Sequence, residues 1–274
     1  MQRFRFHQSS AYGGWHRLRA VLLRIRGGGM GKSQRLYFVT LNGHRYKRLI
    51  LQDSSTARGL EARLERLGFG PAFPRVVTRY ENELWLEFVD GRAVTAADPT
   101  LVEAVAGFYA ALHHDGPRLA TLEDSRLLLR LGRDLDFLHQ AGVLDHERRT
   151  HLKEAAHRLA PATLWMGLDY VDPVLKNFVL RDDGAGLCAV DAESLVDDHP
   201  LGSGIAKALI HWLRPWEEDF WGHFEAAGGP AIREAFPFVE LCFVARWTKT
   251  KVLTGKHKVV DPRHFEPFLV TPSG

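Results

Sequence analysis

The sequence predicts an α+β protein of two lobes, a small β-rich N-terminal lobe and a mainly helical C-terminal lobe. Between residues 24 and 90, short runs rich in β-branched and aromatic residues alternate with turn signals. After residue 90, most apolar residues recur at helical spacing. Asp90-Gly91 separates the two patterns. We therefore expect a basic tail or short helix over 1–23, the first lobe over 24–90 and the second over 91–274.

The composition is that of a soluble globular chain. Its 274 residues are 45% apolar and 25% charged, and no apolar run approaches the roughly 20 residues that span a bilayer. Val21-Leu22-Leu23 is too short for the apolar core of a signal peptide. Two cysteines do not make a disulfide framework. A cytoplasmic location is therefore expected.

Positive charge gathers at the two ends of the chain. The net charge is only +3, but residues 1–52 hold eleven Lys or Arg and no acidic residue, and residues 246–258 form a second basic run without acids. Such runs favour phosphate groups, an anionic acceptor, peripheral contact with a membrane surface or nucleic acid, and a solvated basic face explains each run equally well. The chain lacks a zinc, RNP or helix-turn-helix pattern, so nucleic acid is disfavoured as a partner.

The first lobe combines a glycine run with predicted strands. Strands are expected over 36–40, 46–52, 73–77 and 83–89, and Asn42-Gly43 is a hairpin turn signal. GGGMGKS resembles a phosphate loop, but residue 26 is Arg and a strand-like segment follows, where a true phosphate loop must open a helix. The alternatives are a purely structural turn and a glycine-rich hairpin that covers nucleotide phosphates with the backbone of Gly28, Gly29 and Gly31.

A lysine and a glutamate in this lobe suit a nucleotide site. Ser54-Ser55-Thr56 offers cap hydroxyls for a helix over 57–67, which carries Glu61. In kinase-type sites a strand lysine binds the α/β-phosphates and pairs with a glutamate on the next helix. Lys47 and Glu61 are placed for these roles, although Arg48 replaces Lys47 if the strand phase is shifted, and Glu61 also suits a solvated helix face. At the end of the lobe, backbone groups of Glu87 to Val89 are candidates to bind an adenine edge.

The second lobe carries helical patterns and one chemically distinctive segment. Helices are expected over 100–113, 125–141, 146–159, 205–213, 216–226 and 231–246. Between them, Asp172 precedes Asn177 by five residues, and a strand, a turn and a strand then lead to Asp191. Phosphoryl transfer from ATP needs a carboxylate that orients the attacking hydroxyl, with an amide oxygen and a second carboxylate that share Mg²⁺. Scattered histidines show no metal-ligand spacing.

The segments YVDPVLKN, from Tyr170, and VDAE, from Val190, resemble two motifs of the aminoglycoside phosphotransferase and choline kinase superfamily. These motifs are H-G-D-x-x-x-x-N and I-D-x-E/D. LWLEFVDGR and FYAALHHD also look like the hinge and a helix end of that superfamily. The resemblance covers about residues 24–215.

The resemblance implies a protein-kinase-like two-lobe fold and transfer of the γ-phosphoryl group of ATP to a hydroxyl of a small molecule or glycolipid, as in lipopolysaccharide core kinase-like proteins. It gives the catalytic role to Asp172 and the Mg²⁺ to Asn177 and Asp191, while Lys47, fixed by Glu61, would bind phosphate. The chain departs from the motif at three positions: Tyr170 replaces His, Val171 replaces Gly, and Gly204 lies near an expected Asp. These departures leave a catalytically silent nucleotide- or partner-binding protein as the alternative.

Overall fold

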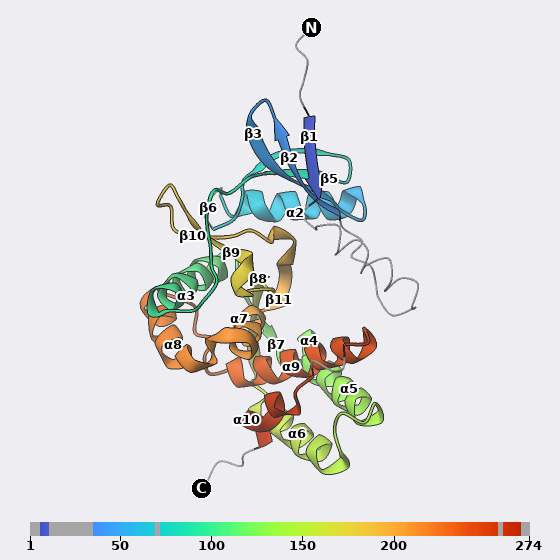
Figure 1. Ribbon diagram of the computed structural model, residues 1–274. Helices are drawn as coiled ribbons and strands as arrows, with labels where there is room; N and C mark the ends of the chain where they lie inside the picture. The colour runs from blue at the N-terminus through green and yellow to red at the C-terminus, as the bar shows by residue number, and fades with distance from the viewer. Residues whose placement is uncertain (1–5, 11–34, 69–71, 257–259, 270–274) are drawn as a thin grey trace. The chain divides into compact units, whose positions relative to one another are not determined.

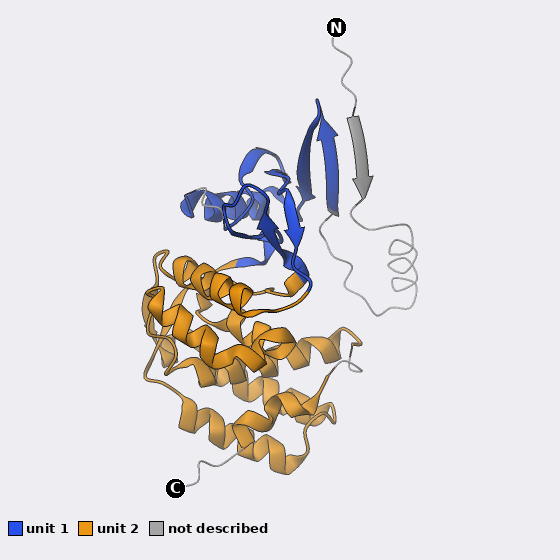
Figure 2. Cartoon of the chain, turned by 60° about the vertical axis from the view of Figure 1, so that its left-hand side comes forward, with its two compact units in different colours: residues 1–95, 176–195 blue, residues 96–175, 196–274 orange. Residues whose placement is uncertain are grey.

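The structure, a computed structural model, describes residues 6–10, 35–68, 72–256 and 260–269 (Figure 1). The chain forms two compact units, coloured in Figure 2. The first unit holds residues 1–95 and 176–195, and the second holds residues 96–175 and 196–274. The α+β class and the β-rich first unit agree with the prediction. The segment 176–195, which we placed in the helical lobe, joins the first unit because its strands pair there.

The first unit is built on a five-stranded antiparallel sheet of order β1-β2-β3-β5-β4. Its strands are β1 (Phe6–Ser10), β2 (Arg35–Leu41), β3 (His44–Ile50), β4 (Val76–Tyr80) and β5 (Glu83–Glu87). Strand β1 lies within the segment expected to be a tail or helix, and it pairs along β2 from Phe6 opposite Leu41. Asn42 and Gly43 have φ of 52° and 82°, the left-handed pair that a tight hairpin requires, so the predicted turn is confirmed.

Helix α2 (Ser54–Arg66) follows β3 and buries Ala57, Leu60 and Leu64. Its N-cap is Asp53 rather than one of the predicted hydroxyl residues, because the Asp53 carboxylate accepts a hydrogen bond of 2.8 Å from the Thr56 N–H. Hydrogen bonds from Ser55 and Thr56 lower the pKa of Asp53 to about 2. The carboxylate therefore stays charged at the positive end of the helix dipole.

A second sheet of the first unit has the order β10-β9-β6. It combines β6 (Gly91–Ala93) with the hairpin of β9 (Phe178–Arg181) and β10 (Leu187–Ala189), which the short helix η1 (Leu175–Asn177) precedes and η2 (Ala192–Ser194) follows. A Cβ on Gly91 would lie 2.2 Å from the Leu180 carbonyl oxygen. Glycine at position 91 thus permits the close pairing that holds segment 176–195 in this unit.

The second unit is mainly helical. Its elements are α3 (Pro99–His113), β7 (Arg118–Thr121), α4 (Leu122–Ser125), α5 (Leu127–Gln140), α6 (His146–Leu159), β8 (Thr163–Tyr170), β11 (Leu195–Pro200), α7 (Ser203–Ala208), η3 (Leu209–Leu213), η4 (Arg214–Trp216), α8 (Glu217–Ala226), α9 (Phe236–Leu253), η6 (Pro262–Phe265) and α10 (Glu266–Leu269). A core of leucine, alanine, valine and phenylalanine side chains joins α5, α6, α9 and α10. Full burial of each large apolar side chain contributes about 1.5–3 kcal/mol.

Three predictions for the second unit need correction. Helix α9 begins at Phe236, where Pro237 occupies its first turn, rather than at Ala231, and it continues into the basic run as far as Leu253. The predicted helix over 205–213 starts at Ser203 and widens into the π-helical turn η3. The sequence patterns also missed β7 and β8, which pair antiparallel. In the described part of the chain, no helix is both long and apolar enough to cross a bilayer.

Candidate functional site

Lys47 is the buried cation of the first unit. Along β3, Lys47 and Leu49 are buried whereas Tyr46, Arg48 and Ile50 are half-exposed, which is the period-two alternation of a strand with one covered face. The Lys47 Nζ donates to the Val190 carbonyl oxygen at 2.6 Å and to Glu193 Oε2 at 3.1 Å. Lys47 is 7% exposed. It is therefore tied to the segment that carries Asp191, 144 residues later in the chain.

Arg48, the alternative phosphate ligand, lies on the other face of β3. Its guanidinium pairs with Glu83, with a 2.9 Å bond from Nε, and lies 5.6 Å from the centre of the Trp85 ring. Of the two adjacent cations, Lys47 is therefore the one that contacts the Asp191 segment.

Asn177 and Asp191 are brought together by the β9–β10 hairpin. The Val190 N–H donates to the Asn177 carbonyl oxygen at 2.8 Å, which places Asp191 one residue from that contact. Asn177 is 9% exposed, and Asp191 is half-buried. The Ser194 hydroxyl donates to Asp191 Oδ2 at 2.9 Å and orients the carboxylate. Lys47, Asn177 and Asp191, distant in the sequence, thus gather in one unit.

The charges around Lys47 are only partly balanced. Burial raises the pKa of Glu193 above its ordinary value, and the charge of Asp191 adds to this effect, whereas Lys47 opposes it. The Lys47 ammonium group is therefore shared by Glu193 and the Val190 carbonyl oxygen, and the Asp191 carboxylate lies between these two positions in the sequence.

The oxygen ligands at Asn177 and Asp191 fit Mg²⁺ bound together with a nucleotide. Mg²⁺ prefers oxygen ligands and is typically held by one or two carboxylates, substrate phosphates and water. Within the described ranges, no group of three or more His, Cys, Asp or Glu side chains could hold a metal ion. The described residues of the first unit therefore offer two oxygen-bearing side chains for a metal ion but no self-sufficient metal site.

Glu61 occupies a different position from the predicted one. It forms an ion pair with Arg79 of β4, while Lys47 pairs with Glu193. The 14-residue spacing placed Glu61 on α2 correctly, but the helix turns this side chain toward the neighbouring strand. Gly28, Gly29 and Gly31 lie outside the described residues.

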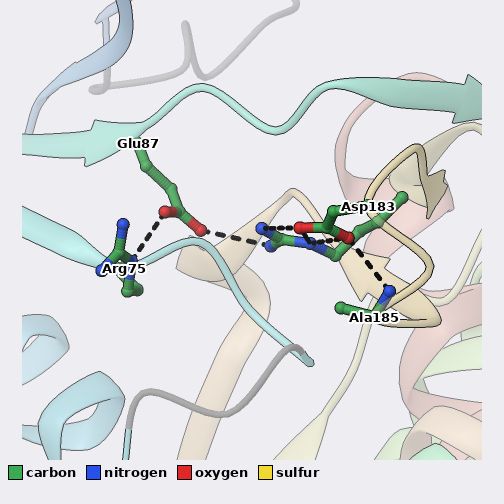
Figure 3. A network of polar contacts seen from close by, with 5 residues as sticks. Arg75, Glu87, Asp183 and Ala185 are labelled. Atoms are coloured by element: carbon green, nitrogen blue, oxygen red, sulfur yellow. Dashed lines mark hydrogen bonds and ion pairs between the residues drawn. The ribbon is translucent and has the colours of Figure 1, made fainter.

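The end of β5, the predicted hinge, is held by polar contacts. The Glu87 N–H donates to the Arg75 carbonyl oxygen at 2.9 Å, so this donor is already used within the fold. The Glu87 carboxylate accepts from Arg75 at 2.8 Å and from Arg181 at 3.2 Å, and Arg181 also bonds Asp183 (Figure 3). Val89, two residues on, is half-buried. Its backbone is the remaining candidate for an adenine contact.

In the second unit, Asp172 follows the end of β8. Its carboxylate forms an ion pair with Lys207 of α7. The indole N–H of Trp212 donates to the Pro173 carbonyl oxygen at 2.8 Å and fixes the residue after Asp172. Asp172 is therefore held at a defined place on the helical unit, beside a cation.

The loop that carries Asp172 is braced by buried groups that the sequence analysis did not assign. Tyr170 is fully buried, and its carbonyl oxygen accepts a 2.8 Å bond from the Tyr109 hydroxyl. Asp169, also fully buried, contacts His113 Nε2 at 3.2 Å and accepts from the Gly204 N–H at 3.0 Å. These contacts anchor the loop to α3 and α7.

Two kinds of functional candidate escaped the sequence analysis. Glu193 carried a signal, because it occupies the last position of the VDAE segment, but no role was assigned to it. Asp169 and Lys207 carried none, since a single acid in an apolar run and a single lysine on a helix have no distinctive spacing. Their roles arise only from tertiary contacts.

Comparisons with known proteins agree with this geometry at the level of fold. No protein-family model matches the sequence, and no curated protein matches it. Among solved structures, a macrolide 2'-phosphotransferase type I is similar with a TM-score of 0.60 at 14% identity, over 95% of this chain and 97% of that one. An ethanolamine kinase of Plasmodium vivax is similar with a TM-score of 0.59 at 12% identity, over 97% of this chain and 81% of that one.

The ADP-bound aminoglycoside phosphotransferase APH(2'')-Ib gives a TM-score of 0.55 at 15% identity, over 92% of this chain and 95% of that one. The kinase-like fold that the motifs implied is thereby confirmed for this chain. Identities this low show the fold alone.

Proposed function

We propose that this protein is an ATP- and Mg²⁺-dependent phosphotransferase that moves the γ-phosphoryl group to a hydroxyl of a small molecule. One observation carries the proposal: Lys47 bonds both the Val190 carbonyl oxygen and Glu193, on either side of Asp191. A buried lysine held beside a potential Mg²⁺ ligand is the pairing that phosphate binding by a kinase fold requires. The fold neighbours, whose names describe phosphotransferases and kinases, support this choice.

Each residue then has a definite task. Lys47 binds the α/β-phosphates, and Glu193, in place of Glu61, positions its ammonium group. Asn177 and Asp191 would hold Mg²⁺, which would supply positive charge at the phosphates when bound. Asp172 accepts or orients the proton of the attacking hydroxyl.

The remaining nucleotide contacts are main-chain groups. The Val89 backbone binds the adenine edge, and the backbone of Gly28, Gly29 and Gly31 covers the phosphates.

The acceptor and the location of the protein form a separate part of the proposal. The names of the neighbours specify macrolides, ethanolamine and aminoglycosides, so the fold does not select one acceptor. A glycolipid acceptor, membrane contact through the basic ends and a cytoplasmic location stay predictions. In the C-terminal basic run, Arg246 and Lys249 pair with Asp134, which reduces the charge available for a membrane surface.

Nucleotide binding tests the first half of the proposal. Mg·ATP should raise the melting temperature of the parent, and Asp191→Ala should remove the Mg²⁺ dependence of that shift. Asp182→Ala is the matched control, because Asp182 is an exposed carboxylate in the same hairpin. A parent that Mg·ATP does not stabilise, or an Asp191→Ala variant that keeps its Mg²⁺ dependence, would contradict the assignment.

The second candidate function is nucleotide binding without turnover. It is favoured by the ion pair that Lys207 forms with Asp172, because this ion pair engages the carboxylate that catalysis would need to orient a hydroxyl. ATP consumption by the parent and by Asp172→Ala separates the two functions. Turnover that is lost in the variant, with nucleotide binding retained, supports catalysis, and turnover absent from the parent across an acceptor screen supports the silent alternative.

A further inference from the structure

The surroundings of Asp172 on the helical unit are cationic. Lys207 of α7 pairs with Asp172, and the charges of Lys207 and Asp172 both act on Lys251, near the end of α9. The same three charges act on His211, one turn after Lys207. One lysine therefore pairs with Asp172 and a second lies within its electrostatic influence, and α7 and α9, which carry the two lysines, pack against each other.

Lys251 is a cation without a carboxylate partner. No described side chain forms an ion pair with it, and every Asp and Glu of the chain lies among the described residues. Its Nζ instead lies 5.1 Å from the centre of the Trp247 ring. Burial and the charges of Lys256 and Lys207 lower the pKa of Lys251, because desolvation and repulsion between like charges both disfavour its protonated form.

The other basic residues of α9 already have a carboxylate partner, which singles out Lys251. Arg246 and Lys249 contact Asp134 at 2.9 and 2.8 Å, and Asp134 is only 2% exposed. The basic run that the sequence shows as one block thus divides in two. One part stabilises the helical core, and the other adds uncompensated charge near Asp172.

Aromatic rings form the apolar border of this cluster. Trp247 lies 6.1 Å from the His211 ring and 5.6 Å from the His264 ring, both edge-on, measured between ring centres. Burial and the charges of Lys207 and Lys251 lower the pKa of His211, so this ring is neutral at pH 7 and offers hydrogen bonds rather than charge. The cluster therefore combines a free ammonium group, hydrogen-bonding rings and a planar apolar face.

We propose that Lys251, with His211 beside it, binds an anionic group, a phosphate monoester or a carboxylate, on the small molecule whose hydroxyl is presented to Asp172. This inference rests on the proposed function for the role of Asp172. An anion at Lys251 relieves the repulsion between Lys207 and Lys251, and the ion pair between Lys207 and Asp172 is kept. The acceptor is thus a soluble anionic hydroxyl compound, and Lys251 determines specificity rather than taking part in the chemistry.

The competing explanation is that the lysines bind the phosphates of ATP, and the test separates the two. The probe is inorganic phosphate, titrated by calorimetry against the full chain saturated with Mg²⁺ and the non-hydrolysable analogue AMP-PNP, whose γ-phosphate fills the nucleotide site. We expect phosphate to bind the parent and its affinity to fall roughly fivefold in Lys251→Gln, the effect of one half-buried charged contact. Lys153→Gln, which removes an equal charge from α6 of the same unit, should leave phosphate affinity unchanged.

The outcomes are distinct. Equal phosphate affinity in the parent and Lys251→Gln, or no phosphate binding once AMP-PNP is bound, overturns the proposal. Weaker AMP-PNP binding by Lys251→Gln with unchanged phosphate affinity assigns the lysine to the nucleotide and also overturns it. Lys251-dependent binding to phosphatidylglycerol vesicles without phosphate binding overturns the soluble acceptor. If AMP-PNP fails to bind the parent, the proposed function fails, and phosphate titration of the nucleotide-free chain still tests the anion site.

Discussion

The Lys47–Glu193 pair allows a stability prediction whose sign depends on pH. Lys47→Met keeps the length of the side chain but removes the ammonium group, and this leaves Glu193 in a site where its side chain is 13% exposed. Removal of one partner from a buried pair typically costs about 3–5 kcal/mol, because the remaining charge is uncompensated. Since Glu193 keeps some exposure and can take up a proton, we expect the lower end, about 3 kcal/mol at pH 8.

The deficit should shrink as the pH falls. The pKa of Glu193 is already raised in the folded parent, so its contribution to stability is full below the ordinary pKa and is lost as the pH rises through the folded pKa. Without Lys47 the folded pKa rises further and this loss grows. As the pH falls, more of Glu193 is protonated in the variant, so the remaining deficit approaches the loss of the bond to the Val190 carbonyl, about 1 kcal/mol.

Urea unfolding followed by circular dichroism at pH 5 and pH 8 measures both values. The variant Glu193→Gln completes a double-mutant cycle, and the double variant should recover to within about 1 kcal/mol of the parent at pH 8. Lys153→Met, which breaks a more exposed ion pair with Asp136, is the control and should cost less than about 1 kcal/mol at either pH. An equal deficit at both pH values, or no recovery in the double variant, would refute the reasoning.

Three further substitutions test other parts of the structure. Gly204→Ala would place a Cβ 2.0 Å from the Tyr170 carbonyl oxygen, so urea unfolding should show a loss of about 3 kcal/mol, and wild-type stability would contradict this packing. Asp134→Ala leaves Arg246 and Lys249 of α9 without their shared carboxylate partner, a residue that is only 2% exposed, and should lower the free energy of unfolding by about 3 kcal/mol. A loss below about 1 kcal/mol would show that these ion pairs are dispensable. Glu61→Gln should change the Kd for Mg·ATP less than about twofold, since Glu61 pairs elsewhere, whereas Glu193→Gln should weaken it about tenfold, and the reverse order would restore the original assignment.

Local patterns predicted much of the fold because they report local physics. Asn42-Gly43 adopts the left-handed turn that its residue types favour, and the helix expected over 146–159 has those bounds. The sequence left Lys47 and Arg48 as alternatives, and the burial pattern of β3 in the structure, which covers Lys47 and half-exposes Arg48, distinguishes the two residues. The backbone of Asn177 bonds Val190, the residue before Asp191, and the joint role of Asn177 and Asp191 stays a prediction.

The partner of Lys47 could not be predicted in the same way. A spacing of 14 residues places Glu61 on the right helix, but the direction of its side chain depends on how α2 packs against β4, where Arg79 is available. Glu193 lies 146 residues from Lys47, and no periodicity relates the two positions. The ion pair follows from the pairing of β9 with β6, which carries residues 176–195 into the first unit.

Two of the departures from the catalytic-loop motif, at Tyr170 and Gly204, lie in contact with each other. A side chain at position 204, such as the aspartate expected near it, would bring a Cβ 2.0 Å from the Tyr170 carbonyl oxygen. With glycine there, α7 approaches closely enough for the Gly204 N–H to donate to Asp169, a buried carboxylate that also contacts His113. In this chain the loop is thus braced by an acid on the strand, three residues before Asp172. By its motif position alone Gly204 looks like a defect, but its contacts show that the loop carrying Asp172 depends on glycine at this position.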